Sequence, residues 1–240
     1  MKAAARQHSL PKLLTASRAA HDIGISLRYG LCRSRDQAPE SGPGSKTGSK
    51  RAAHAQVLQV LRRGQLQLGA ALGAGATGDV YQGVYGGQAA AVKVMGQASS
   101  WRPAGSYKWE YTVYQQLGEL QGSCVPRVLG HGLIDFYDEY FIALELLQGT
   151  PLARLPRPLD EEVCSGARAA LSRLHARGVL HGDVRLENFV AVPSSSAGSG
   201  SRWRVVVLDF DSACLNASAA DMREEVVELK RQLRSARAQA

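Results

Sequence analysis

Two short motifs constrain this chain more than any other feature of its sequence. The first is HGDVRLENFV at His181–Val190, and the second is VVVLDFDSA at Val205–Ala213. In the first motif Asp183 precedes Asn188 by five positions, and in the second Asp209 follows a run of apolar residues. A carboxylate can accept the proton of an incoming hydroxyl, while asparagine and aspartate oxygens are ligands for the Mg²⁺ that bridges ATP phosphates. The motifs therefore predict a phosphoryl-transfer site with Asp183 as base and with Asn188 and Asp209 as metal ligands.

Length and composition are those of a globular protein with one sizeable core. The chain has 240 residues, of which 45% are hydrophobic. No segment reaches the roughly 18 consecutive apolar residues of a membrane-spanning helix, so we do not expect an integral membrane protein. The four cysteines are scattered without a CxxC pair, which disfavours a zinc site or a disulfide framework. This pattern fits a reducing compartment, and a cytoplasmic location is expected.

Positive charge is concentrated near the N-terminus. The formal net charge is +8, and residues 1–51 contain only three acids, Asp22, Asp36 and Glu40. This composition is that of a disordered basic tail, with an organelle transit peptide as the alternative. Because no basic stripe is interleaved with aromatic residues, we expect no specific nucleic-acid partner. Binding to RNA or to a membrane surface is a further alternative, which only the tail supports.

Residues 52–148 have the pattern of a short helix followed by an antiparallel sheet with one more helix. A short helix is expected over Ala52–Arg63, and the glycine-punctuated period of two over Gln65–Gly96 predicts three strands joined by turns. A second helix is expected over Tyr107–Leu117. Two more strands complete a predicted five-stranded sheet, namely Val125–Gly132 and Tyr140–Leu147.

The rest of the chain is predicted to be mainly helical. Asp160 is expected to cap a helix that ends near Gly178. A last helix is expected over Asp221–Leu233, with Asp221 as N-cap and Glu224 completing a capping box. Short strands or turns are expected around the two motifs. The predicted fold class is therefore α+β.

A glycine-rich turn lies between the first predicted strands. Gly73, Gly75 and Gly78 form the pattern GxGxxG, in which the backbone can approach phosphate oxygens closely. The alternative is a flexible turn without a ligand. A dinucleotide-binding fold is disfavoured, because the next element has the pattern of a strand and not of a helix.

Lys93 and Glu110 are predicted to pair. Lys93 lies in the small-residue strand AAAVKV, where a charge is costly to bury unless it has a partner. Glu110 on the following helix can hold the amine toward the α- and β-phosphates of ATP. Taken singly, each residue could equally be a surface charge.

The strand FIALELL and the first motif supply further candidates. The backbone near Glu145 and Leu147 can bind the edge of an adenine, while Val80 and Ala91 cover its face. The alternative is a plain buried strand. Arg185 can place positive charge near the phosphoryl group in transfer, or it can be a solvated side chain.

Taken in order, these segments resemble the eukaryotic-type protein kinases. The resemblance extends from Gln65 to Ala213 and rests on LGAGATGDV, AAAVKV, Glu110, LELL, LHARGVLHGDVRLEN and LDFD. It implies a kinase-like domain at residues 52–240, with an antiparallel N-lobe at about 65–148 and a short, mainly helical C-lobe at about 149–240. It also implies ATP and Mg²⁺ as cofactors. The implied catalytic residues are Asp183, Lys93, Glu110 and Arg185, the metal ligands are Asn188 and Asp209, and the nucleotide site comprises Leu72, Gly73, Gly75, Gly78, Val80, Ala91, Lys93, Glu145, Leu147 and Val190.

The chain also departs from this family. Gly182 replaces the arginine of the HRD motif, so a switch by activation-loop phosphorylation is not expected. Arg185 stands where many members have lysine, and Asp211 replaces the glycine of DFG. Under about 30 residues follow Asp211, whereas a typical kinase C-lobe continues through an activation segment, an APE motif and several helices. Either the C-lobe is naturally minimal, with a partner that could complete it, or the reading frame is incomplete.

The expected function is transfer of the γ-phosphoryl group of Mg·ATP to a hydroxyl. Protein serine or threonine is ranked first as acceptor. Small-molecule alcohols are the alternative, because HGD and DFD motifs also resemble lipopolysaccharide-sugar kinases and the aminoglycoside and choline phosphotransferases. The alternative from another class is a pseudokinase, that is, an ATP-binding scaffold without turnover. Phosphotransfer is preferred because each group that the chemistry needs is present.

Overall fold

The computed structural model describes residues 59–60, 65–75, 77–96, 106–134, 139–194 and 202–238. The predicted tail or transit peptide at residues 1–51 lies outside them. The described part is α+β with mainly antiparallel pairing, as predicted. The division into two lobes near residue 148 stays a prediction. Within the described ranges, no helix has the length and apolar character needed to cross a membrane.

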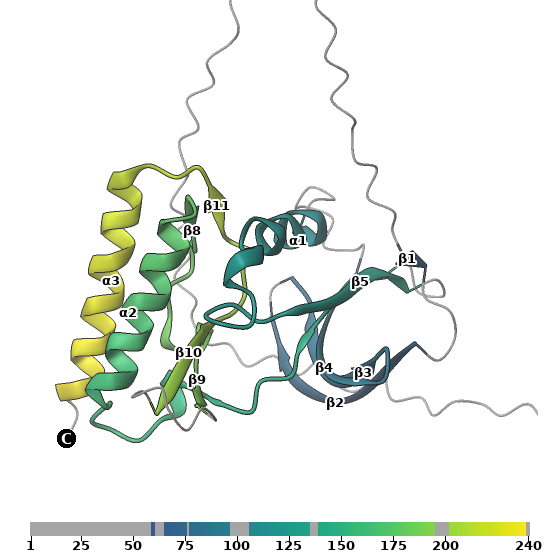
Figure 1. The fold of residues 1–240 in the computed structure, drawn as a ribbon, viewed down its shortest axis with the longest axis horizontal. Helices are drawn as coiled ribbons and strands as arrows, with labels where there is room; N and C mark the ends of the chain where they lie inside the picture. The colour runs from purple at the N-terminus through teal and green to yellow at the C-terminus, as the bar shows by residue number, and fades with distance from the viewer. Residues whose placement is uncertain are drawn as a thin grey trace, which may run out of the picture. The chain divides into compact units, whose positions relative to one another are not determined.

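A six-stranded sheet contains the first half of the described chain (Figure 1). Its strand order is β1-β5-β6-β4-β3-β2, and all neighbours except β1 and β5 are antiparallel. The three strands predicted over Gln65–Gly96 are confirmed. Gly86 and Gly87 join β3 to β4 with φ angles of 56° and 83°, the left-handed conformation that a two-residue hairpin turn requires. The strands are β1 (Gln59–Val60), β2 (Leu66–Ala74), β3 (Asp79–Tyr85), β4 (Gln88–Gly96), β5 (Val128–Ile134) and β6 (Glu139–Glu145).

The helix predicted over Ala52–Arg63 is wrong at the two positions that the structure describes. Gln59 and Val60 form β1 and pair in parallel with β5. The edge of β5 offers unpaired backbone groups, and hydrogen bonds to such an edge can override a local helical periodicity. The other residues of that predicted helix lie outside the described part. As a result, the sheet has one strand more than the predicted five.

Helix α1 (Ser106–Gln116) packs against this sheet, and its prediction is confirmed. Val113, Tyr114 and the following Leu117 are fully buried, as the spacing of one helical face requires. Near the start of the helix, Trp109 Nε1 donates a hydrogen bond of 2.9 Å to the carbonyl of Ala213. This bond ties α1 to the second motif.

Helix α2 (Glu161–His175) begins and ends as predicted. The carboxylate of Asp160 accepts a hydrogen bond of 2.9 Å from the amide of Glu162, which makes Asp160 the N-cap. After the helix, Gly178 has a φ angle of 72°, a conformation that favours glycine. The buried face of the helix consists of Val163, Cys164, Ala167, Ala170, Leu171 and Leu174.

Helix α3 (Ala219–Ala238) is confirmed, but its predicted cap is wrong. The amide of Asp221 donates to Ser218 Oγ at 3.2 Å, and the amide of Ser218 donates to Asp221 Oδ2 at 3.3 Å. The capping box is therefore Ser218 with Asp221, because a serine hydroxyl at the N-cap satisfies the amide three residues on. Glu224 lies inside the helix and is exposed. Helices α2 and α3 lie side by side (Figure 1).

The two motifs overlap or directly adjoin the strands of two small sheets. One has the order β10-β9-β7, and the other pairs β11 with β8. Residues 212–218 alone connect the DFD sequence to α3. This connection leaves α3 close to the first motif, as the site below shows. The strands are β7 (Thr150–Pro151), β8 (Val179–Leu180), β9 (Phe189–Pro193), β10 (Trp203–Val207) and β11 (Cys214–Leu215).

Candidate active site

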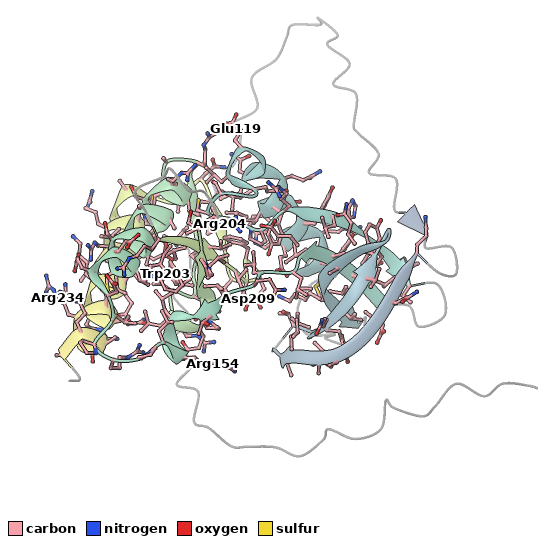
Figure 2. The ribbon with its side chains drawn as sticks, turned by 60° about the horizontal axis from the view of Figure 1, so that its bottom comes forward. Glu119, Arg154, Trp203, Arg204, Asp209 and Arg234 are labelled. Carbon is pink, nitrogen blue, oxygen red and sulfur yellow. The ribbon has the colours of Figure 1, made fainter. Side chains whose placement is uncertain are left out.

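Lys93 lies at the centre of a buried group of charges. It projects from β4, and its Nζ is 2.9 Å from Glu110 Oε2 of α1 and 2.7 Å from Asp209 Oδ1 of the second motif. Lys93 is 7% exposed and Glu110 only 1%. Asp209, labelled in Figure 2, has a side chain that is 39% exposed. The structure thus brings together three of the predicted residues from three elements, including the predicted Lys93–Glu110 pair.

The neighbouring carboxylates keep Lys93 charged. Burial by itself lowers the pKa of the Lys93 amine, but the charges of Glu110 and Asp209 outweigh burial and raise that pKa above its usual value. Burial raises the pKa of the Glu110 carboxyl, and Lys93 opposes this effect. The ionised state of Glu110 therefore depends on the lysine.

The two motifs are joined to each other through their backbones. Asn188 lies in the 3₁₀ turn Leu186–Asn188, and its Nδ2 donates to the carbonyl of Asp183 at 2.9 Å and to Asp183 Oδ2 at 3.1 Å. The amide of Leu208 donates to the carbonyl of Asn188 at 2.9 Å, just before Asp209. Asp209 itself has a φ angle of 64°. These bonds fix the proposed base and the two proposed metal ligands on adjoining loops.

Glu225 of α3, which was not among the predicted site residues, holds the first motif by hydrogen bonds. Its carboxylate accepts hydrogen bonds from the amides of His181 (3.1 Å) and Gly182 (2.7 Å) and lies 2.7 Å from His175 Nε2. It is 9% exposed. A signal was present in the sequence, because Glu225 lies four residues before Leu229 on the buried face of an amphipathic helix. An acid on that face needs buried donors.

Gly182 has a structural reason to be glycine. Its φ angle is 81°, and a Cβ atom at this position would lie 2.0 Å from the carbonyl oxygen of Ser212. The HGD loop therefore passes directly against the connection from the DFD sequence to α3. A larger residue such as arginine does not fit this backbone.

We expect Gly182→Ala to lower the free energy of unfolding by about 2–4 kcal/mol, because it combines an unfavourable positive φ with a backbone clash. Urea denaturation measures this change. Gly118→Ala is the control, because nothing lies within 4 Å of a Cβ atom at Gly118. An alanine variant of Gly182 with the wild-type midpoint would contradict the geometry described above.

Three aromatic rings from α1 and the two motifs are in contact with one another. Phe210 of the DFD sequence meets Tyr114 edge-on, with ring centroids 5.1 Å apart, and its centroid lies 5.4 Å from that of His181. His181 is fully buried, and its Nε2 lies 2.9 Å from the carbonyl oxygen of Leu208. These ring contacts fix α1 relative to both motifs. Glu110 lies on the same helix, one turn before Tyr114.

The glycine turn lies next to Lys93. Val80 pairs with Lys93 across β3 and β4, so the two side chains are on the same face of the sheet, and Ala91 shares that face two residues earlier. In the turn itself, the amide of Gly75 donates to the carbonyl of Gly78 at 2.9 Å. Gly73 pairs with Val80 across β2 and β3, whereas the neighbouring Leu72 is 49% exposed. Of the predicted nucleotide residues in this region, Val80 and Ala91 thus lie beside the lysine.

The remaining candidates lie at the end of β6 and in the first motif. Glu145 faces Ala90 of β4, and its carboxylate is 3.5 Å from Arg127 and 3.6 Å from Arg204. Its backbone amide donates a hydrogen bond of 2.9 Å to the carbonyl of Arg127, so this amide is engaged within the protein. Leu147 follows two residues later and is half-buried, and Val190 is buried in β9. Arg185 Nε lies 3.3 Å from Asp183 Oδ2. The Arg185 side chain is 52% exposed, so its role near the phosphoryl group stays a prediction.

The oxygens of Asn188 and Asp209 fit a magnesium ion. Asn188 donates both of its described bonds through Nδ2, which leaves Oδ1 as an acceptor. Asp209 uses Oδ1 for Lys93 and retains Oδ2. Mg²⁺ is commonly held by one or two protein oxygens, with phosphates and water completing six ligands. In the described ranges, no three His, Cys, Asp or Glu side chains form a metal cluster.

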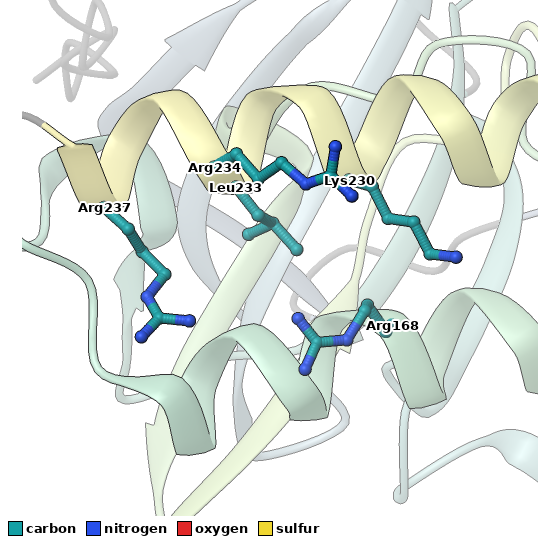
Figure 3. A pocket seen from close by; sticks show the side chains of 5 residues that line it. All are labelled: Arg168, Lys230, Leu233, Arg234 and Arg237. Atoms are coloured by element: carbon teal, nitrogen blue, oxygen red, sulfur yellow. The ribbon is translucent and has the colours of Figure 1, made fainter.

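Two cavities in the described part lie away from these residues. One of about 220 Å³ lies between α2 and α3 and is lined by Leu233 and four cations (Figure 3). Another of about 510 Å³ borders α1 and β5. No candidate active-site residue lines either cavity. The cations of the first cavity are Arg168, Lys230, Arg234 and Arg237.

Comparison with known proteins gives a partial match to a protein kinase. The chain is 32% identical over 137 residues to CBL-interacting protein kinase 4 of rice, Oryza sativa subsp. japonica. The match covers 52% of this chain and 30% of the rice protein, so the chain spans less than a third of that relative. No family model matches. The chain is therefore similar to a protein kinase, and its α+β fold with an antiparallel sheet is compatible with that similarity.

Proposed function

We propose that this protein is an ATP-dependent phosphotransferase of the protein kinase type. The observation that carries the proposal is the grouping of Lys93, Glu110 and Asp209 beside the Asp183–Asn188 pair. Burying a lysine with two carboxylates costs desolvation free energy. The positive charge that is held there can bind phosphate groups, which gives the arrangement a function. The similarity to a rice protein kinase supports the same chemistry.

Each residue has a role in the proposed reaction. Lys93 binds the α- and β-phosphates, and Glu110 holds the lysine in place. Asn188 Oδ1 and Asp209 Oδ2 hold Mg²⁺, which neutralises charge on the phosphates. The oxygen of the acceptor hydroxyl bonds to the γ-phosphorus, and Asp183 accepts the proton of that hydroxyl. The bond between the γ-phosphorus and the β-phosphate oxygen breaks, and ADP leaves. Arg185, next to Asp183, supplies positive charge near the γ-phosphoryl group.

A protein serine or threonine hydroxyl is the first candidate acceptor, because the similar rice protein is a protein kinase. A small-molecule alcohol is the second candidate, and a specific observation favours it. Only residues 212–218 separate the DFD sequence from α3, so this part of the chain offers a peptide little surface on which to lie. Under this proposal the nucleotide binds between an N-terminal and a C-terminal lobe.

We expect Asp183→Asn to lower the rate of ADP production by about 10²–10⁴-fold, because an amide cannot accept the hydroxyl proton. The measurement is Mg²⁺-dependent ADP release by the purified chain, with a generic basic protein and with small alcohols as acceptors. ATP binding should persist in the variant, because Asp183 does not hold the nucleotide.

Glu187→Gln is the matched control, because Glu187 is exposed in the 3₁₀ turn Leu186–Asn188 of the same motif and has no assigned role. It should keep wild-type turnover. Tight ATP binding by the wild-type protein without turnover on any acceptor would contradict the proposal and favour a nucleotide-binding scaffold.

A further inference from the structure

A side-chain hydrogen bond joins the glycine turn to the DFD sequence. Thr77 Oγ1 donates to Asp211 Oδ2 at 3.0 Å, although the two residues are 134 positions apart. Thr77 is only 4% exposed, so its side chain points inward. The other carboxylate oxygen of Asp211, Oδ1, accepts a bond of 2.9 Å from the neighbouring Ser212 Oγ. Both oxygens of Asp211 are thus engaged by hydroxyl groups.

The turn that carries Thr77 is also pressed against the sheet. A Cβ atom at Gly78 would lie 2.2 Å from the carbonyl oxygen of Val94 and 2.9 Å from the Met95 side chain. Thr77 is therefore fixed on one side by the backbone contact of its neighbour and on the other by Asp211. The Lys93–Asp209 contact of 2.7 Å joins a different segment, β4, to the same DFD sequence.

We infer that Thr77 and Asp211 form a latch that sets the affinity of the site for its nucleotide. The inference rests on the proposed function, in which phosphates lie beneath the glycine turn and beside Lys93. In the structure the turn is closed onto Asp211. Phosphate oxygens carry the same sign of charge as the Asp211 carboxylate and are repelled by it, so we expect the turn to move away from this carboxylate, with Thr77, when phosphates enter beneath it. The latch bond is therefore lost on binding, and it weakens affinity by the free energy of that bond.

The residue that forms the latch is a departure from the kinase pattern. Asp211 replaces the glycine of DFG, and glycine has no side chain that could accept the Thr77 hydrogen bond. The substitution thus couples the glycine turn to the loop that holds the proposed metal ligand Asp209. In this chain, Asp211 is therefore a positioning residue, which affects nucleotide binding through its bond to Thr77.

The test is a titration of the full chain with a fluorescent ADP analogue in the presence of Mg²⁺. Thr77→Val keeps the shape of the side chain and removes its hydroxyl, so the dissociation constant should fall by about three- to tenfold. Asp211→Ala should also lower the dissociation constant, and the double variant should bind no more tightly than Asp211→Ala alone, because both changes remove one bond. Ser212→Ala is the matched control, since it removes the bond to the other oxygen of the same carboxylate and should leave the affinity unchanged.

Several outcomes overturn the latch. Weaker binding by Thr77→Val means that the bond holds the turn in its productive position. An unchanged Thr77→Val beside a changed Asp211→Ala means that Asp211 acts by its charge or as a metal ligand. A wild-type chain that binds no nucleotide overturns the proposed function itself, whereas a wild type that binds and a Thr77→Val variant that behaves like it overturn only the latch.

Hydrogen exchange gives a second readout that needs no nucleotide. In the nucleotide-free chain, amides of residues 77–80 should exchange faster in Thr77→Val and in Asp211→Ala than in the wild type or in Ser212→Ala. Equal exchange in all four proteins contradicts the latch, whatever their affinities.

Discussion

Lys93→Met is expected to lower the rate of ADP production by about 10³-fold or more, because the variant keeps the length of the side chain and removes the charge that binds the phosphates. The same substitution should destabilise the fold. Glu110 is 1% exposed and 2.9 Å from the lysine, so it loses its only described cation. Breaking a buried pair in this way costs about 3–5 kcal/mol when the remaining charge stays ionised.

The loss of stability in Lys93→Met should depend on pH in a definite direction. Burial raises the pKa of Glu110, and in the variant Lys93 no longer opposes that effect. A carboxyl with a raised pKa in the folded state contributes its stability below the pKa of the unfolded chain, about 4.3, and this contribution is lost as the pH rises through the folded pKa. Urea midpoints measured from about pH 5 to about pH 8 should therefore fall further below the wild type as the pH rises.

The double variant Lys93→Met/Glu110→Gln is the control for this effect. It has no buried carboxyl at position 110 and should recover most of the stability at the higher pH, without recovering turnover. A Lys93→Met protein with full activity contradicts the proposed mechanism. A loss of stability that is the same at every pH contradicts the role assigned to Glu110.

Glu225→Ala is expected to lower both stability and turnover, although Glu225 has no part in the chemistry. The variant leaves the amide of the fully buried His181 and the amide of Gly182 without their acceptor, and it removes the partner of His175. Each unsatisfied buried donor costs about 1–3 kcal/mol, so we expect a loss of about 3 kcal/mol in the free energy of unfolding. Because Asp183 follows these amides directly, its displacement should lower turnover by about 10²-fold.

Glu224→Ala is the matched control for this prediction, because Glu224 is the exposed neighbour on the same helix. It should change neither property. Glu225→Gln keeps one acceptor oxygen and should lie between the wild type and Glu225→Ala. If Glu225→Ala unfolds at the wild-type urea concentration, the carboxylate does not hold the HGD loop in solution.

Local patterns predicted most of the helices and strands well. The period of two and the paired glycines Gly86 and Gly87 were sufficient for the hairpin of β3 and β4, because its turn type is determined by residues that tolerate positive φ. The cap of α2 at Asp160 likewise depends on neighbours in sequence. The cap of α3 was also local, but two overlapping spacings were present, and only the structure showed that Ser218 and Asp221 form the box.

Apart from the cap of α3, the errors and omissions share one cause, which is contact between residues distant in sequence. Strand β1 forms because the edge of β5 is available, and nothing near Gln59 indicates this. Glu225, Gly182 and the Thr77–Asp211 bond each depend on a contact across at least 30 positions, with Ser212, Asp211 or the first motif as partner. A short window of sequence does not identify the partner in such contacts, even where it shows an acid on the buried face of a helix, as at Glu225.

The sequence by itself supplied the chemical groups of the proposed site, because the proposed phosphate and metal chemistry requires particular groups: an amine at Lys93, oxygens at Asn188 and Asp209, and a carboxylate at Asp183. The tertiary structure alone decided how these groups are held. It brought Lys93 within 2.9 Å of two carboxylates, placed Glu225 beneath the HGD loop and closed the glycine turn onto Asp211. The reason is that a buried charge or amide is stable only with a partner, and the partner's place in the sequence is irrelevant once the chain has folded.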